Sequence, residues 1–273
     1  MLNASPEPTP GFLQGTDNFL QTRPRPTNQR KDTLSIDFLP TAKHTFRARI
    51  QNFNFFEAEA FRGGTDRANR TIDRPNRTYT LNHIWTINPT TVNEALFSAS
   101  YDRVYLVVPN TEGRANRSRY GIDYPYIFPE RKEIFDKIPT IDINNFQRID
   151  GGPYPASSSG PIWQVSNTTT KIRGNHTLKF GVRWERAGQN DFDQINVAGV
   201  PGGTNNQNGR FVFTDNRAGG SGLAVGNAAL GLFSSYAEIG PRAYTPYRGE
   251  MLEWFVQDSW KVTPKTRVEL GVR

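Results

Sequence analysis

Apolar and polar side chains alternate with a period of two in short stretches along this chain, and the stretches come in pairs. In the clearest stretch, Tyr79, Leu81, Trp85 and Ile87 fall on one side, with His83 in the same row. The other apolar rows run over 34–38, 46–50, 95–101, 163–165, 178–184, 252–256 and 268–272. A period of two predicts β-strands with one apolar face, and the pairs predict antiparallel hairpins.

The connections between these stretches differ strongly in length. Within each pair the predicted turn is short: Pro40–Lys43, Asn88–Thr91, Arg173–Asn175 and Thr263–Thr266. Between pairs the links run over roughly 54–77, 104–161 and 187–247 and are rich in Gly, Asn, Pro and Arg. Links this long without regular structure are unusual in compact soluble domains. Short turns at one rim and long loops at the other are typical of outer-membrane β-barrels.

Strand length and the placement of aromatic residues favour the same architecture. The runs Thr78–Ile87 and Val92–Arg103 approach the roughly 9–11 residues that a tilted strand needs to span a membrane. Amphipathic rings near both strand ends would form the girdles of a membrane barrel, and here they are Trp85, Trp260, Tyr79 and Tyr101. We therefore predict an all-β fold, with antiparallel up-and-down strands forming part of a large transmembrane β-barrel with long extracellular loops.

Composition is compatible with this fold. The 273 residues are 36% hydrophobic and 22% charged, and no stretch approaches the ~20 consecutive apolar residues of a membrane-spanning helix. Barrel strands stay polar on average because lipid-facing and lumen-facing side chains alternate. Cysteine is absent, which excludes disulfides, thiolate zinc sites and cysteine nucleophiles.

The net charge of +7 has two interpretations, a nucleic-acid surface or basic loops. The arginines gather in loop-like stretches such as 62–77 and 114–119, and no nucleic-acid-binding motif accompanies them. We favour basic loops and expect no nucleic-acid partner.

Few residue patterns point to chemistry. The three histidines, His44, His83 and His176, are far apart in sequence and form no local metal motif. The serine run 157–160 lacks the G-x-S-x-G pattern of a nucleophile elbow. The glycine stretches 151–152 and 219–222 do not continue into a phosphate-binding loop.

Loop acids are the remaining candidates. Asp191, Asp193 and Asp215, with nearby asparagines, are possible ligands for calcium in an extracellular loop, but their spacing does not match an EF-hand. We predict no catalytic, cofactor or metal site and hence no enzyme. The ligand-binding residues are not identified by the sequence.

The two ends of the chain bear on its organisation. Residues 1–6 have neither a basic nor an apolar region of a secretory signal, and residues 267–273 still alternate. We predict an irregular lead-in over 1–30 and a partial barrel of about eight strands over 31–273, truncated at both ends.

Three segments resemble a known family. Trp85–Glu94 resembles a hairpin of TonB-dependent-receptor-like barrels, in particular the Oar-like proteins with a carboxypeptidase-regulatory-like domain. Residues 174–181, Gly-Asn-His-Thr-Leu-Lys-Phe-Gly, are similar to a strand opening of these barrels. Residues 255–264, Phe-Val-Gln-Asp-Ser-Trp-Lys-Val-Thr-Pro, are similar to another of their hairpins.

The resemblance implies ligand uptake through a barrel in the outer membrane of a Gram-negative type bacterium. It implies outer-membrane lipid around the barrel, an unknown small ligand, and a TonB-type periplasmic partner that supplies energy to the full-length protein. Two alternatives stay open. A passive porin or adhesion-type barrel would share these strands. A soluble β-sandwich binding module would share the alternation but would have a buried apolar face and loops of similar length at both ends.

Overall fold

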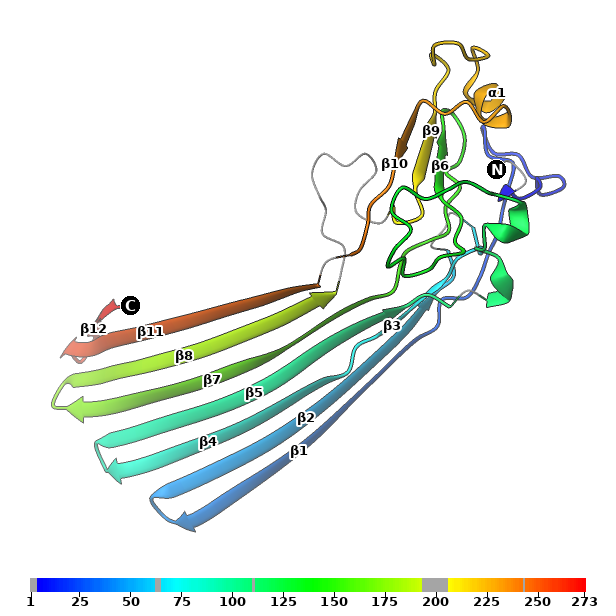
Figure 1. Ribbon diagram of the computed structural model, residues 1–273. Coiled ribbons are helices and arrows are strands. Elements are labelled where there is room, and N and C mark those ends of the chain that lie inside the picture. The colour runs from blue at the N-terminus through cyan, green and yellow to red at the C-terminus, as the bar shows by residue number, and fades with distance from the viewer. Residues whose placement is uncertain (1–3, 62–64, 110, 193–205, 243) are drawn as a thin grey trace.

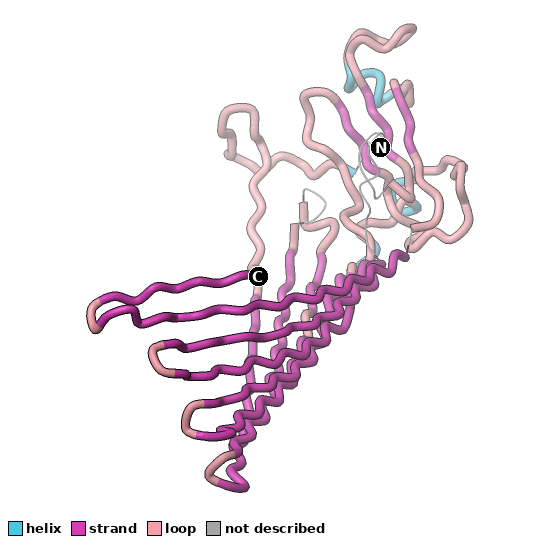
Figure 2. Tube along the Cα trace, turned by 90° about the vertical axis from the view of Figure 1, so that its left-hand side faces the viewer, coloured by secondary structure: helices cyan, strands magenta, loops and turns pink. Residues whose placement is uncertain are grey.

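The computed structural model describes residues 4–61, 65–109, 111–192, 206–242 and 244–273. Their backbone forms two bodies, a single curved layer of long strands and a smaller body at one end of it (Figures 1 and 2). The opposite end of the layer carries the short turns (Figure 2). Among the described residues, no helix is long and apolar enough to cross a membrane.

The layer is one antiparallel sheet of nine strands with β1 and β12 at its edges. The strands are β1 (Thr27–Thr41), β2 (His44–Glu59), β3 (Arg70–Asp73), β4 (Asn76–Asn88), β5 (Thr91–Val107), β7 (Ala156–Arg173), β8 (His176–Phe192), β11 (Tyr244–Thr263) and β12 (Thr266–Val272). The eight predicted strands are all present, and the predicted fold class is confirmed. Most strands are longer than predicted, up to 20 residues in β11, so the links between pairs are shorter.

The ninth strand, β3, is a continuation of β4 rather than a new position in the sheet. Both lie between β2 and β5, and the register of β2 continues from Glu57↔Ile72 in β3 to Phe53↔Asn76 in β4. Only Arg74 and Pro75 separate them, and Arg74 still exchanges backbone hydrogen bonds with Phe55. Proline has no backbone N–H to donate and therefore interrupts the ladder without displacing the strand.

Each long hairpin closes with a two-residue turn, and the turns differ in a way that the sequence explains. The turns after β1, β4 and β11 lack glycine, and in each case the register shifts by one residue just before the turn. The turn between β7 and β8 has Gly174 at a φ of +57°, and its register is continuous to the end. A left-handed residue gives the twist that a tight hairpin requires, whereas other turns need a bulge.

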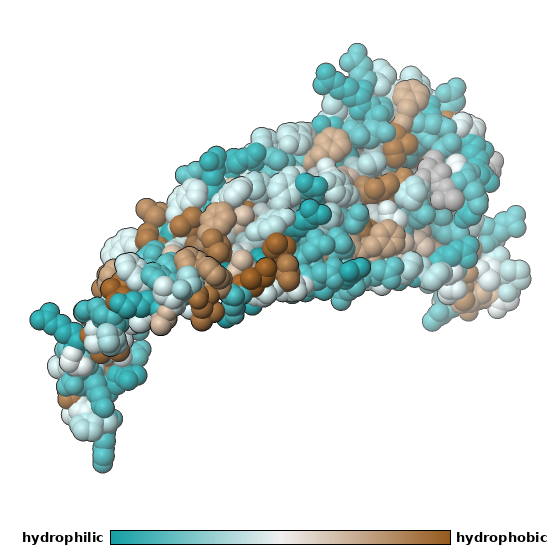
Figure 3. All heavy atoms as spheres, turned by 90° about the horizontal axis from the view of Figure 1, so that it is seen from below, coloured by the Kyte–Doolittle hydropathy of each residue, from teal (hydrophilic) through white to brown (hydrophobic). Residues whose placement is uncertain are grey.

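One face of the sheet, here called the apolar face, is lined by exposed hydrophobic side chains. Leu252 is 69% exposed and Trp254 is 55% exposed, and leucine, isoleucine, phenylalanine and valine side chains on the other long strands are similarly open. Seen from below, brown side chains gather over the strands, with polar atoms toward both ends (Figure 3). Among the described residues no second sheet packs on this face, as a β-sandwich would require.

The smaller body, here called the cap, is built from the long links. It contains a three-stranded sheet in the order β10-β9-β6, with β6 (Thr140–Ile143), β9 (Arg210–Phe213) and β10 (Ser235–Ala237), and helix α1 (Ala224–Ala229). Ile141 and Phe213 are fully buried in its core, together with Ala4 from the N-terminal segment. The prediction of links without regular structure was therefore wrong for 104–161 and 187–247, and also for 54–77, where β2 continues and β3 lies. Their strands are too short for the alternation to be visible.

Candidate ligand-facing surfaces of the sheet and cap

The face of the sheet opposite the apolar face, here called the polar face, carries paired charges. Asp37 and Arg47 lie directly opposite each other on β1 and β2 and form a two-pronged ion pair, with contacts of 2.7 and 2.9 Å. At the other edge, Glu253 accepts from Arg273 at 2.7 Å and lies 3.7 Å from Arg183. Bidentate arginine–carboxylate geometry orients both groups, so this face presents an ordered polar surface.

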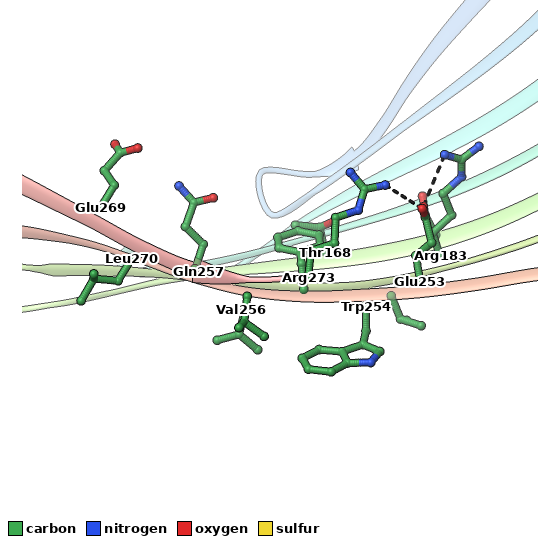
Figure 4. A pocket seen from close by; sticks show the side chains of 14 residues that line it. Thr168, Arg183, Glu253, Trp254, Val256, Gln257, Glu269, Leu270 and Arg273 are labelled. Carbon is green, nitrogen blue, oxygen red and sulfur yellow. Dashed lines mark hydrogen bonds and ion pairs between the residues drawn. The ribbon is translucent and has the colours of Figure 1, made fainter.

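A hollow of about 580 Å³ lies beside these residues, at the edge formed by β11 and β12. Its lining comes from both faces: Trp254 and Val256 point away from the polar face, whereas Gln257 and Glu253 belong to it (Figure 4). β12 pairs with β11 only from Val256 to Thr263. The hollow therefore lies where the pairing of β12 with β11 ends, at an open strand edge, so we do not assign it a ligand.

The cap has a buried ion pair at its centre. Lys132 and Glu238 are in contact, and their side chains are 1% and 0% exposed. The Glu238 carboxylate also accepts from the backbone N–H groups of Ile127 and Phe128, at 3.0 Å each. Burial acts to raise the pKa of Glu238, but the hydrogen bonds from Lys132, Tyr236 and the two backbone groups outweigh it and hold the pKa below its usual range.

A second buried lysine supports the junction between cap and sheet. Lys137 donates to the carbonyl oxygens of Gly152 and Pro153, and its ammonium lies 3.4 Å from the ring centroid of Tyr154. Burial lowers the pKa of Lys137 to about 7, and this outweighs the opposing charge of Asp150. Asn208 accepts from the Tyr154 hydroxyl at 2.5 Å, which fixes β9 against this segment.

Many arginines of the two basic loop stretches are used inside the cap. Arg114 bridges Glu112 and Asp66, and Arg117 lies over the rings of Tyr124 and Tyr126. Arg70 pairs with Glu59 between β3 and β2 of the sheet. These arginines therefore have partners within the protein, and the absence of a nucleic-acid partner stays a prediction.

The histidines are paired across strands at the turn end of the sheet, on the apolar face. His44 and His83 are in contact through their ring nitrogens at 3.0 Å, and His44 stacks on Trp85. His176 contacts Asp258 at 2.7 Å and stacks on Trp260. Neither pair lies within a predicted hairpin: His44 and His83 are on β2 and β4, and His176 and Trp260 are on β8 and β11. Finding them requires the order of the hairpins in the sheet, which the sequence pattern does not give.

The remaining sequence candidates do not converge on a site. Ser158 donates to Asp191 at 2.5 Å and has no histidine beside it among its hydrogen-bond partners. Asp215 accepts from the backbone N–H of Ala224 at the start of α1. Asp193 lies outside the described residues. Among the described residues, no group of three or more histidine or acidic side chains is arranged to hold a metal ion.

The glycine stretches also have structural surroundings. Gly151 packs against the side chain of Lys137, and the Gly152 N–H donates to Asp150. In the other stretch, the Ser221 hydroxyl and N–H both contact Asn227. Both stretches therefore shape the cap.

Comparison with known proteins gives a family. A family model described as outer membrane beta barrel domain matches residues 1–273. No curated protein matches the chain. Among solved structures, the outer membrane transporter YddB from Escherichia coli is similar, with a TM-score of 0.47 and 8% identity over 94% of this chain and 28% of that chain. This chain thus spans less than a third of the length of that transporter.

Proposed function

Because this chain belongs to the outer membrane beta barrel domain family, we propose that it forms part of the wall of a TonB-dependent-type transport barrel. Its location is the bacterial outer membrane. In such barrels the short turns are periplasmic and the long loops extracellular, so the cap stands on the outside of the cell. The apolar face then faces lipid and the polar face the lumen.

The observation that carries the transport proposal is the polar face. Paired charges on this side fit the polar interior of a membrane barrel and would be costly against lipid. Here the ion pairs Asp37–Arg47 and Glu253–Arg273 line the lumen side of both edges of the sheet. The ordered extracellular cap gives a second surface for capturing a ligand before it enters. The chemistry is gated passage without covalent steps, and we propose no enzymatic role.

Energy coupling rests on the sequence resemblance of three segments, Trp85–Glu94, 174–181 and 255–264. In the resembled family a plug fills the lumen, and a periplasmic partner that draws on the inner-membrane proton gradient moves it. We infer the same partner and a small ligand for the full-length protein. Siderophore, oligosaccharide and peptide are the ligand classes to compare.

Electrical conductance separates this function from a passive barrel. The complete protein that carries this chain is to be inserted in planar lipid bilayers, and uptake of each ligand class is to be measured in cells with and without a protonophore. We expect no steady open conductance and an uptake that the protonophore abolishes. Steady conductance with protonophore-insensitive uptake would instead establish a passive porin. An adhesion-type barrel would give neither conductance nor uptake.

A further inference from the structure

Two arginines lie on the apolar face, where only lipid would surround them. On β8 the outward row is Leu178, Phe180, Val182 and Trp184, followed by Arg186. On the neighbouring strand β11 the outward row ends in Glu250 and Arg248, which pair in register with Arg186 and Gly188. Arg186 directly follows the apolar stretch of β8, and on β11 Glu250 and then Arg248 follow it.

Strand geometry places this border at the outer surface of the membrane. Arg186 is ten residues from His176, which stacks on Trp260 at the periplasmic end. At ~3.3 Å per residue and a tilt of ~40°, ten residues rise about 25 Å along the membrane normal. This equals the height of the apolar band of an outer-membrane barrel, about 25 Å. Arg186 and Arg248 thus lie at the level of the extracellular lipid headgroups.

The same border is cationic on other strands. Arg77 follows the outward row of β4 and Arg103 that of β5, and both are exposed. Arg30 takes the corresponding place on β1, next to Asp32. Arginines thus outnumber acids at the outer border of the apolar face. A headgroup that binds here must bring negative charge.

A hollow of about 360 Å³ brings two of these arginines together with aromatic rings. Its lining includes Phe97, Trp163, Trp184, Arg186 and Arg248. Gly188 lies directly opposite Arg248 and two residues after Arg186 on β8, and its missing side chain leaves room there. The hollow is therefore basic on the extracellular side and apolar on the side toward the membrane centre.

The two guanidinium groups are held differently. Arg248 donates to the carbonyl oxygens of Tyr247 and Gln189 and to the Asn190 side chain, which fixes its position. Arg186 has a long contact with Glu250, 3.6 Å, and its side chain is 56% exposed. A guanidinium carries five N–H donors in a fork that matches a phosphate. Arg186 therefore retains donors that a phosphate oxygen can accept.

We propose that this hollow is a binding site for a phosphate-bearing lipid of the outer leaflet. The phosphate accepts from Arg186 and Arg248, and the acyl chain lies against Trp163, Trp184 and Phe97. Only a lipid presents a phosphate and a hydrocarbon chain at this height and on this face. The site depends on the family and on the orientation of the barrel, and it does not depend on which ligand is transported.

The test measures lipid affinity for the complete barrel that carries this chain, purified in a neutral detergent. Bisphosphorylated lipid A and the same lipid with its phosphates removed are to be titrated and bound copies counted by native mass spectrometry. We expect the double variant Arg186→Gln/Arg248→Gln to bind the phosphorylated form about tenfold more weakly, since a charged hydrogen bond is lost. Its affinity for the dephosphorylated form stays unchanged.

Arg49→Gln is the matched control, because it removes one positive charge from the polar face of β2. It should leave both affinities at the wild-type value. Equal loss in this control, or an unchanged affinity in the double variant, overturns the site. A wild-type protein that binds both lipid forms equally overturns it without any variant. Displacement of the bound lipid by millimolar inorganic phosphate alone would overturn the role given to the acyl chain.

Discussion

The sheet and the cap contain the same kinds of apolar residues, but the sheet exposes them and the cap buries them. In the sheet, Leu252 is 69% exposed, and the aromatic and aliphatic rows of the other strands are similarly open. In the cap, Phe213 is 0% exposed, and the charged side chains of Lys132 and Glu238 are buried as an ion pair. The cap buries apolar surface against itself, as a water-soluble domain does. The sheet leaves its apolar face open, as is expected of a barrel wall that lipid covers. The two parts of the chain therefore suit different surroundings, lipid for the sheet and water for the cap. The same kind of substitution should have different effects on stability in the two parts.

The largest expected effect is in the cap, where a charge has been removed from water. Glu238→Gln leaves the Lys132 ammonium buried without its carboxylate, which should destabilise the cap by about 3–5 kcal/mol. The rate of limited proteolysis of the cap in intact outer membranes would measure this. The double variant Lys132→Met/Glu238→Leu is the control and should stay close to wild type, because it removes both charges. Equal cleavage of all three proteins would mean that the pair does not hold the cap.

A smaller effect is expected on the apolar face of the sheet. Val256 lies midway between Trp260 and Glu250 in the outward row of β11. Val256→Arg should cost about 2–4 kcal/mol, since a charged side chain at the bilayer midplane is penalised by that amount. Urea unfolding in lipid vesicles measures it. Gln257→Arg, one residue away on the polar face, should change little. A similar loss in both variants would contradict the assignment of the two faces.

The smallest effect, taken per pH unit, is a dependence of cap stability on pH. The folded-state pKa of Lys137 is about 7, below its ordinary value of 10.5. Between these values the opened cap binds a proton that the closed cap does not, so stability rises with pH by at most about 1.4 kcal/mol per unit. Below pH 7 both states are protonated and this dependence vanishes.

Proteolysis of the cap between pH 7 and 9, normalised to a control peptide, would measure the rise. Burial raises the pKa of nearby Asp150. A raised carboxyl pKa makes cap stability fall as the pH rises, opposite to the effect of Lys137, and this fall begins at acid pH, above the ordinary pKa of aspartate. In Lys137→Met the increase in protection from pH 7 to 9 should disappear. Persistence of the full increase in that variant would assign it to another group.

The sequence predicted the sheet far better than the cap, for a physical reason. Long strands with one face in lipid repeat the same alternation over many residues, so Leu178 to Trp184 or Tyr79 to Ile87 identify their strands without tertiary information. The cap strands are three or four residues long, and their core depends on contacts between distant links. In Thr140–Ile143 a partly exposed residue is followed by a buried one only twice, and no local pattern distinguishes this segment from a loop.

Site residues divide in the same way. Asp37 and Arg47 lie within one hairpin and were accessible once that hairpin was predicted. His176 and Trp260 lie on different hairpins, so their contact also requires the order of the hairpins in the sheet. The buried partners of the cap, Lys132 with Glu238 and Tyr154 with Asn208, come from different links. These partners come into contact only when the whole cap is folded, and their spacing in the sequence does not predict the contact.

The four two-residue turns also bear on the order in which the chain assembles. Each long hairpin joins strands that are adjacent in sequence, so its loop-closure cost is small and pairing can begin locally. The cap instead requires the parallel pairing of β6 with β9, in which Thr140 meets Arg210. Between these two residues the chain passes through the whole of the β7–β8 hairpin. Non-local pairing of this kind is slow, so the cap should close only after that hairpin has joined the growing wall.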